Sequence, residues 1–311
     1  MQQEVTIATR GSKLALWQAN HVADLLRAEY PGLQVSLKTI KTSGDKIQDV
    51  PLAKIGGKAL FVKEIEEAML AGEADLAVHS MKDVPAVLPQ GLKLGVVPRR
   101  EDFSDCLLSK DYPDLKSLPE GSVVGTSSLR RQAQLLALRP DLEIRSLRGN
   151  LDTRLRKLQQ GEYTAIVVAS AGLLRLGLQA EHCYRLQPPD FLPAIGQGAL
   201  ALEYPEANTE LEEHLAFMEH GPTRYALAAE RSFLHELEGG CQVPIAGLAR
   251  QEGPDSLLLQ TLVADLQGRR VLRRQARSEL SRAEDMGREV AREILDSGGR
   301  EILQEIYSSQ D

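Results

Sequence analysis

The sequence has few aromatic side chains, no excess of positive charge and no long apolar run. Aromatic residues make up 4% of the 311 positions, too few for the stacking platforms that bind single-stranded nucleic acid. The formal net charge is −7, so no global basic field attracts DNA, RNA or an anionic membrane. No apolar run reaches the ~18 to 20 residues of a membrane-spanning helix. These absences predict a protein without nucleic-acid or membrane partners.

Cysteine is also scarce. Cys106, Cys183 and Cys241 are the three cysteines, and none belongs to a CxxC pair, which predicts neither a disulfide framework nor a zinc site. The first residues lack the charged and apolar segments of an export signal. We therefore expect a reducing, cytoplasmic setting and no metal, with Cys106 and Cys183 as structural residues.

Arginine, in contrast, is abundant. The 37 basic residues are 25 Arg and 12 Lys, and no Lys follows Lys157. Because Arg binds carboxylate or phosphate with two parallel hydrogen bonds, this bias predicts local anion sites on an acidic background. For the C-terminal arginines we favour compositional bias over a binding role. They are Arg269, Arg270, Arg273, Arg274 and Arg277.

Strand-like and helix-like segments alternate in the first part of the chain. Residues 4–9, 33–40 and 74–80 have the pattern of strands, and residues 13–30 and 61–72 have helical periodicity. Such alternation predicts a parallel sheet with helices on its faces.

A weak internal similarity predicts a second domain of the same kind. Residues 72–80 resemble 161–170, and residues 7–19 resemble 124–137. We expect two similar α/β domains with a ligand in the crevice between them, at the carboxyl ends of the strands. The alternative is a chance likeness of generic strand-helix units.

From about residue 220 the pattern changes to strands followed by helices. This order predicts a small α+β domain, with Cys241 on the loop that enters its first strand. The expected elements are a helix over 222–238, strands over 243–250, 256–265 and 269–277, and helical residues over 281–307.

Polar and basic residues follow several predicted strands. A helix N-terminus with Ser and Thr side chains binds anions. Arg130 and Arg131 in a first helical turn have the wrong sign for the helix dipole, so we expect a bound anion to compensate them. Solvated arginines and interdomain salt bridges are the alternatives. The set is Arg10, Ser12, Thr126, Ser127, Ser128, Arg130, Arg131, Arg148, Arg154 and Arg175.

Two further features suggest catalysis. Ser80, Lys82 and Asp83 follow a buried strand, where a carboxylate in a cleft can serve as an acid or base. A surface ion pair is the plain alternative, and we expect His79 to be a core histidine. Cys241 lies in the loop EGGCQVPIAG, where the glycines give exposure. No histidine lies near it in sequence, and an incidental thiol is the alternative.

Together these segments resemble the porphobilinogen deaminase (hydroxymethylbilane synthase) family nearly end to end. The blocks that carry the resemblance occur in the family's order. They are IATRGSKLALWQA, GDKIQDVPLAKIGGKALFVKEIE, ADLAVHSMKDVP, VGTSSLRRQAQL, IRSLRGNLDTRL, LPAIGQGALA and EGGCQVPIAG.

The resemblance implies an α/β fold with three domains. Two α/β domains would be similar to the halves of a type II periplasmic binding protein, and a small α+β C-terminal domain would carry the cysteine. Domain 1 would comprise 1–98 and 199–217, domain 2 would comprise 104–192, and domain 3 would comprise 221–311.

The resemblance also implies the chemistry. A dipyrromethane cofactor would be attached to Cys241 through a thioether, and four porphobilinogen molecules would be condensed head to tail on it, with loss of ammonia. Asp83 would be the catalytic residue, and Gln197 would contact the growing chain or tune domain movement. The protein would act as a monomer. The residues that bind carboxylates would be the strand-end set above with Ser80, Lys82 and, in a mobile loop over 41–60, Lys54 and Lys58.

Three other functions fit less well. A solute-binding protein for an organic anion would need neither Asp83 nor Cys241 and usually has an export signal. A cysteine acyl transferase would need a histidine base, and the spacing of the six histidines offers no convincing pair. A nucleic-acid protein conflicts with the charge and the few aromatic residues.

Overall fold

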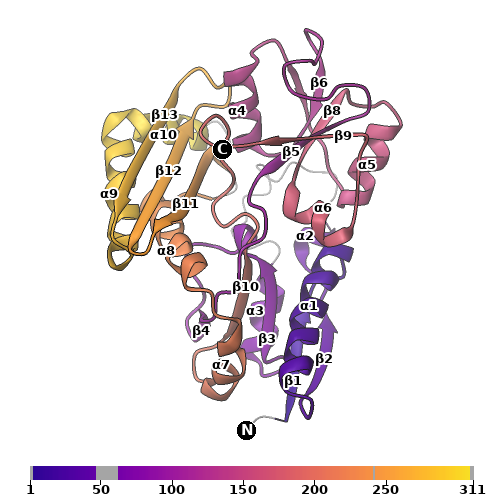
Figure 1. Ribbon diagram of the computed structural model, residues 1–311, viewed down its shortest axis with the longest axis vertical. Coiled ribbons are helices and arrows are strands. Elements are labelled where there is room, and N and C mark those ends of the chain that lie inside the picture. Colours follow the sequence, from indigo (N-terminus) through magenta and orange to yellow (C-terminus); the bar gives the residue numbers. More distant parts are fainter. Residues whose placement is uncertain (1–2, 47–61, 241, 309–311) are drawn as a thin grey trace. The chain divides into compact units, whose positions relative to one another are not determined.

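The computed structural model describes residues 3–46, 62–240 and 242–308. It divides into two compact units. Of the described residues, the first unit contains 3–46, 62–101 and 198–224, and the second contains the rest. Figure 1 shows the course of the chain.

The first unit is built on a five-stranded mixed sheet with the order β2-β1-β3-β10-β4. β1 pairs in parallel with β2 and β3, and β10 pairs antiparallel with β3 and β4. The segment around 198–204 therefore lies in this sheet, as the resemblance implies. The strands are β1 Glu4–Thr9, β2 Gln34–Thr39, β3 Leu76–Ser80, β4 Leu92–Leu94 and β10 Leu200–Pro205.

Helices pack on both faces of this sheet because alternate strand residues point to opposite sides. α1 places Val22 and Leu26 against one face, and α3 places Ile65 and Met69 against the other. Ser43–Lys46 forms the short helix α2 within a segment predicted as loop. The other helices are α1 Lys13–Glu29, α3 Lys63–Leu70 and α7 Thr209–Leu215 (Figure 1).

The second unit contains a sheet of the same design, with the order β7-β6-β8-β5-β9. β6 pairs in parallel with β7 and β8, and β5 pairs antiparallel with β8 and β9. The predicted likeness of the two α/β segments is thus confirmed, since β6 and β8 take the places of β1 and β3. The elements are β5 Asp105–Ser109, β6 Val123–Gly125, α4 Leu129–Leu138, β7 Glu143–Arg145, α5 Leu151–Gln159, β8 Ala165–Ala169, α6 Ser170–Leu176 and β9 His182–Leu186.

The C-terminal part of the second unit is an antiparallel three-stranded sheet with helices, as predicted. Phe233, Leu259 and Ile294 belong to its apolar core. A second cluster joins Ala133 of α4 to Leu262 of β12, which explains why the two sheets form one unit. The elements are α8 Gly221–Glu236, β11 Ile245–Gly253, β12 Ser256–Ala264, β13 Val271–Ser278, α9 Ala283–Ile294 and α10 Arg300–Ser308.

The arginines of β13 and of the turn before it form hydrogen bonds and ion pairs with other residues of the protein. The carbonyls of Pro189 and Asp190 accept from Arg273, and Arg277 pairs with Glu252 at 2.9 Å. Arg270 pairs with Asp265 at 3.4 Å. These contacts agree with the interpretation that the C-terminal arginines are not an anion site.

Candidate active site

A small pocket of about 70 Å³ lies in the first unit, where β1 and β3 end side by side. Its polar lining brings together residues from two predicted blocks. Arg10 and Ser12 come from the end of β1, and His79, Ser80 and Asp83 come from the end of β3. The lining is completed by Leu14, Ala15, Gln18, Val62 and Val78.

Local structure holds these side chains in place. Ser12 caps α1, and its Oγ accepts a hydrogen bond from the Ala15 amide at 3.2 Å. The Gln18 side chain donates to Ser80 Oγ at 2.9 Å. After β3 the chain turns in a 3-10 helix, Met81–Asp83, which carries the carboxylate into the pocket.

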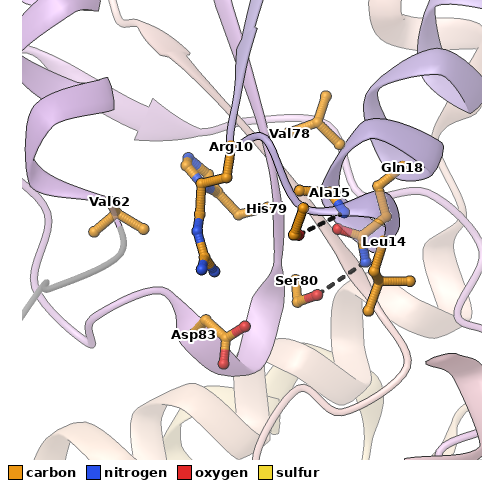
Figure 2. Close-up of a pocket in the computed structure, with 10 residues that line it drawn as sticks. Arg10, Leu14, Ala15, Gln18, Val62, Val78, His79, Ser80 and Asp83 are labelled. Atoms are coloured by element: carbon orange, nitrogen blue, oxygen red, sulfur yellow. Dashed lines mark hydrogen bonds between the residues drawn. The ribbon is translucent and has the colours of Figure 1, made fainter. Parts of the chain in front are cut away.

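Figure 2 shows the Arg10 guanidinium and the Asp83 carboxylate pointing into the same hollow. A fixed cation beside a half-buried carboxylate suits a substrate with acidic groups that develops positive charge as it reacts. Lys82 is also half-buried but is not part of the lining.

Two buried glutamates, Glu66 and Glu203, lie on the α3 side of the sheet, and Glu203 contacts the pocket residue His79. His79 Nε2 is 3.1 Å from Glu203 Oε2, and both side chains are buried. Glu66 of α3 is 5% exposed. Burial, followed by the negative charges of Glu203 and Glu67, raises the pKa of Glu66 to about 7. His79 is thus buried, as predicted, and also lines the pocket.

Glu66→Gln should remove a pH-dependent loss of stability. Wild-type Glu66 has a pKa of about 7 when folded and 4.5 as its ordinary value, so the folded state keeps a proton that the unfolded state has released. The unfolding free energy should therefore fall as pH rises between these values, by about 3 kcal/mol, because each unit of pKa difference is worth about 1.4 kcal/mol. Urea unfolding of wild type and variant from pH 4 to pH 8 measures the difference.

The unfolding free energy of the variant minus that of wild type should therefore be larger at pH 8 than at pH 4. Glu67→Gln is the matched control, because this neighbouring carboxylate is exposed and should change little. A wild-type-minus-variant difference that stays constant across this pH range would contradict the assignment.

In the second unit, the hydroxyl groups of the residues that follow β6 form hydrogen bonds mainly with backbone groups of the protein. Thr126 Oγ1 accepts from the Ser128 amide at 3.1 Å, and Ser127 Oγ donates to the Leu147 carbonyl at 2.8 Å. Ser128 caps α4 by accepting from the Arg131 amide at 3.4 Å. The three residues thus shape the start of α4.

Arg130 and Arg131 point into the protein and bind Asp105 of β5. Arg130 Nη1 lies 2.6 Å from Asp105 Oδ2, and Arg131 Nη2 lies 2.7 Å from Oδ1. Burial alone would raise the pKa of Asp105, but the two guanidinium charges and their hydrogen bonds hold it well below its usual range. Asp105 thus compensates both guanidinium charges within the protein, so their position in the helix does not require a bound anion. The binding of a ligand by these arginines stays a prediction.

Gln197 belongs to the same buried cluster. Its Nε2 donates to the Phe103 carbonyl at 2.8 Å and to Asp105 Oδ1 at 3.0 Å. These contacts fasten the segment after Leu192 to β5, which fits the predicted influence on domain movement better than contact with the growing chain. That influence stays a prediction.

Arg148 has the clearest feature of an anion site in the second unit. Its Nη2 is buried and has no hydrogen-bond partner among the described residues. Gly149 follows with φ +105°, where an added Cβ would lie 2.8 Å from the Thr153 side chain. The Arg154 side chain donates to the Gly149 carbonyl at 2.9 Å. This loop therefore keeps Arg148 close to the start of α5.

Three predicted site residues lie outside the described part of the chain. They are Lys54, Lys58 and Cys241. Arg175 lies in the last turn of α6 and is half-buried.

Sequence reasoning missed the groups that act through distant partners. Asp105 had a weak signal, an acidic residue at the start of an otherwise apolar run, DCLL. The pairing of His79 with Glu203 had none, because 124 positions separate the two residues.

The fold, the pocket with Asp83 and the loop with Arg148 together indicate the kind of ligand that the protein binds. Two mixed five-stranded sheets of the same design, with cationic side chains after their strands, are suited to an organic anion. Residues 5–213 match the family model "Porphobilinogen deaminase, dipyromethane cofactor binding domain", and residues 225–296 match "Porphobilinogen deaminase, C-terminal domain". The chain belongs to the porphobilinogen deaminase family.

Two known relatives support the assignment over nearly the whole length of the chain, and a third protein is similar to it only in structure. Porphobilinogen deaminase of Nitratidesulfovibrio vulgaris (strain DP4) is 61% identical over 308 residues, covering 99% of this chain and 98% of that protein. The enzyme of Maridesulfovibrio salexigens is 58% identical over 305 residues, covering 98% and 99%. A periplasmic aliphatic sulphonate binding protein of Escherichia coli has a TM-score of 0.40 at 16% identity, covering 76% of this chain and 71% of that protein.

The activity follows from the family. The enzyme is a transferase that condenses four porphobilinogen molecules, with loss of ammonia, into the linear tetrapyrrole hydroxymethylbilane. Its cofactor is dipyrromethane, and its product enters tetrapyrrole biosynthesis. Across the described residues, no helix is long and apolar enough to cross a membrane.

Proposed function

We propose that Asp83 is the catalytic residue of this condensation and that Cys241 is the site of cofactor attachment. The observation that carries the first role is the pocket, in which Asp83 shares a small space with Arg10. The second role rests on the match of EGGCQVPIAG to the family pattern.

Asp83 has the chemistry that the reaction requires. Loss of ammonia needs a proton at the departing nitrogen, and the substrate carbon then carries positive charge. A carboxyl group can donate that proton, and the resulting carboxylate stabilises the cation that develops. Arg10 in the same pocket would hold a substrate carboxylate.

The second unit offers a group that fits the acidic side chains of the cofactor. The buried Nη2 of Arg148 lacks a partner among the described residues, and a carboxylate would satisfy it with a charge-assisted hydrogen bond. When bound, dipyrromethane supplies the primer for the four condensations. Ser127 and Arg154 would support this loop.

The remaining site residues have a less direct basis. Arg130 and Arg131 would reach a ligand only by leaving Asp105, so we assign them first to holding β5 and α4 together. The others keep their predicted role as ligands of substrate or cofactor carboxylates. They are Ser12, Lys54, Lys58, Ser80, Lys82, Thr126, Ser128 and Arg175.

We also propose that the enzyme is a cytoplasmic monomer without nucleic-acid or membrane partners. The net charge of −7 and the 4% aromatic content support the absence of nucleic acid. Porphobilinogen is the small-molecule partner.

Intact-mass measurement tests the attachment site. Wild type should carry an excess mass equal to two linked pyrrole units, and Cys241→Ser should lack it and lose all turnover, because a serine hydroxyl does not form the thioether that holds the primer. Cys183→Ala is the matched control and should keep the excess, since this thiol belongs to β9. A Cys241→Ser protein that carries the full excess would refute the assignment.

A further inference from the structure

Two cysteines that are 77 positions apart in sequence meet in the second unit. Cys106 lies in β5 and Cys183 in the adjacent antiparallel strand β9. The register pairs Cys106 with Arg185 and Leu108 with Cys183, so the cysteines are diagonal neighbours on one face of the sheet. Their Sγ atoms are 2.9 Å apart.

This separation leaves little movement before a bond can form. A disulfide bond is about 2.05 Å long, so the sulfurs need to approach by roughly 0.9 Å. β9 is an edge strand, with β5 as its neighbour on one side and no paired strand on the other among the described residues. An edge strand is held on one side only, so a shift of this size does not require the sheet to be rebuilt.

The two thiols differ in their access to solvent. Cys183 is exposed, whereas Cys106 is buried. Burial raises the pKa of the Cys106 thiol to about 12, with Cys183 adding to the rise and the Ser170 hydroxyl opposing it. Cys183 is therefore the thiol that an oxidant in solution reaches first.

We propose that Cys106 and Cys183 form a reversible disulfide when the enzyme meets a peroxide. The Cys183 sulfur attacks one peroxide oxygen, the O–O bond breaks, and Cys183 sulfenic acid and one water form. The Cys106 sulfur then attacks the Cys183 sulfur, so that the S–S bond forms and the S–O bond breaks. The leaving hydroxide takes the Cys106 proton as a second water.

The balance of this reaction is complete. Two thiols lose two protons and two electrons, and hydrogen peroxide accepts them to become two waters. Ser170 Oγ, which lies 3.1 Å from Cys106 Sγ, can donate a hydrogen bond to the developing thiolate. The proposal does not depend on the role proposed for Cys241.

Peptide mapping of the oxidised enzyme tests the proposal. Reduced, cofactor-bound enzyme is freed of reductant, treated with hydrogen peroxide, denatured, alkylated and cleaved with trypsin without reduction. Residues 101–110 and 176–185 are the tryptic peptides that contain the two cysteines. We expect them as one linked species, about 2 Da lighter than the two free peptides together, and its separation by dithiothreitol.

Two variants make the result specific. Cys183→Ala changes an exposed residue and should leave the buried Cys106 thiol fully alkylatable after the same treatment. Cys106→Ala should let Cys183 proceed to sulfinic acid, because no neighbouring thiol resolves the sulfenic acid. The proposal fails if wild type also gives sulfinic acid at Cys183, if both peptides stay alkylatable, or if either links to the peptide containing Cys241.

Discussion

Asp83→Asn should lower turnover by about 100- to 10,000-fold while the protein keeps its fold and its cofactor. The amide has nearly the same shape and can still lie in the pocket with Arg10. It cannot donate an acidic proton to the departing nitrogen, and it has no charge to stabilise the cation that follows. Steady-state assay of porphobilinogen consumption measures the loss, and intact mass verifies the cofactor.

A matched control separates chemistry from structure. Asp75 lies just before the same strand, and its Oδ2 accepts from the Thr6 amide at 2.7 Å, outside the pocket. Asp75→Asn keeps an acceptor there and should retain wild-type turnover. Near-normal turnover of Asp83→Asn would remove that residue as the catalyst.

Asp105→Asn should be the most destabilising single substitution among the polar residues discussed above. It would leave the buried guanidiniums of Arg130 and Arg131 without a negative partner. Removing one member of a buried ion pair costs about 3 to 5 kcal/mol, because the remaining charge stays desolvated. Urea unfolding at pH 7 measures the change in unfolding free energy.

The sign of the pH dependence is also defined. Since the folded-state pKa of Asp105 is lowered from 3.8, its stabilisation is present above that ordinary value and is lost as pH falls toward the lowered one. Asp285→Asn is the control, because the Arg288–Asp285 pair is exposed at 38% and 53%; this substitution should change the unfolding free energy little. If Asp105→Asn lowers the unfolding free energy no more than this control does, the ion pairs of Asp105 do not stabilise the fold as proposed.

Local pattern predicted most of the fold and one half of the site. Alternation and helical periodicity located β1, α1 and β3, and parallel strands bring their carboxyl ends to one edge of a sheet. The meeting of Arg10 and Ser12 with Ser80 and Asp83 was therefore predictable.

Side-chain direction and long-range pairing were not predictable in this way. The sequence places Arg130 and Arg131 in a first helical turn, but only the position of β5, some 25 residues earlier, turns them inward to Asp105. His79 and Glu203 meet only because β10 lies beside β3. Periodicity describes each segment separately and contains no information on such partners.

The place of β10 has a consequence for synthesis on the ribosome. β4 reaches the first sheet only through β10, and β10 is translated more than 100 residues after β4. During that interval β3 exposes an unpaired edge, the kind of surface on which nascent chains aggregate. The sheet of the first unit can thus be completed only after most of the polypeptide has left the exit tunnel. A messenger truncated before β10 would therefore yield a chain that is degraded by proteases and does not form a smaller binding domain.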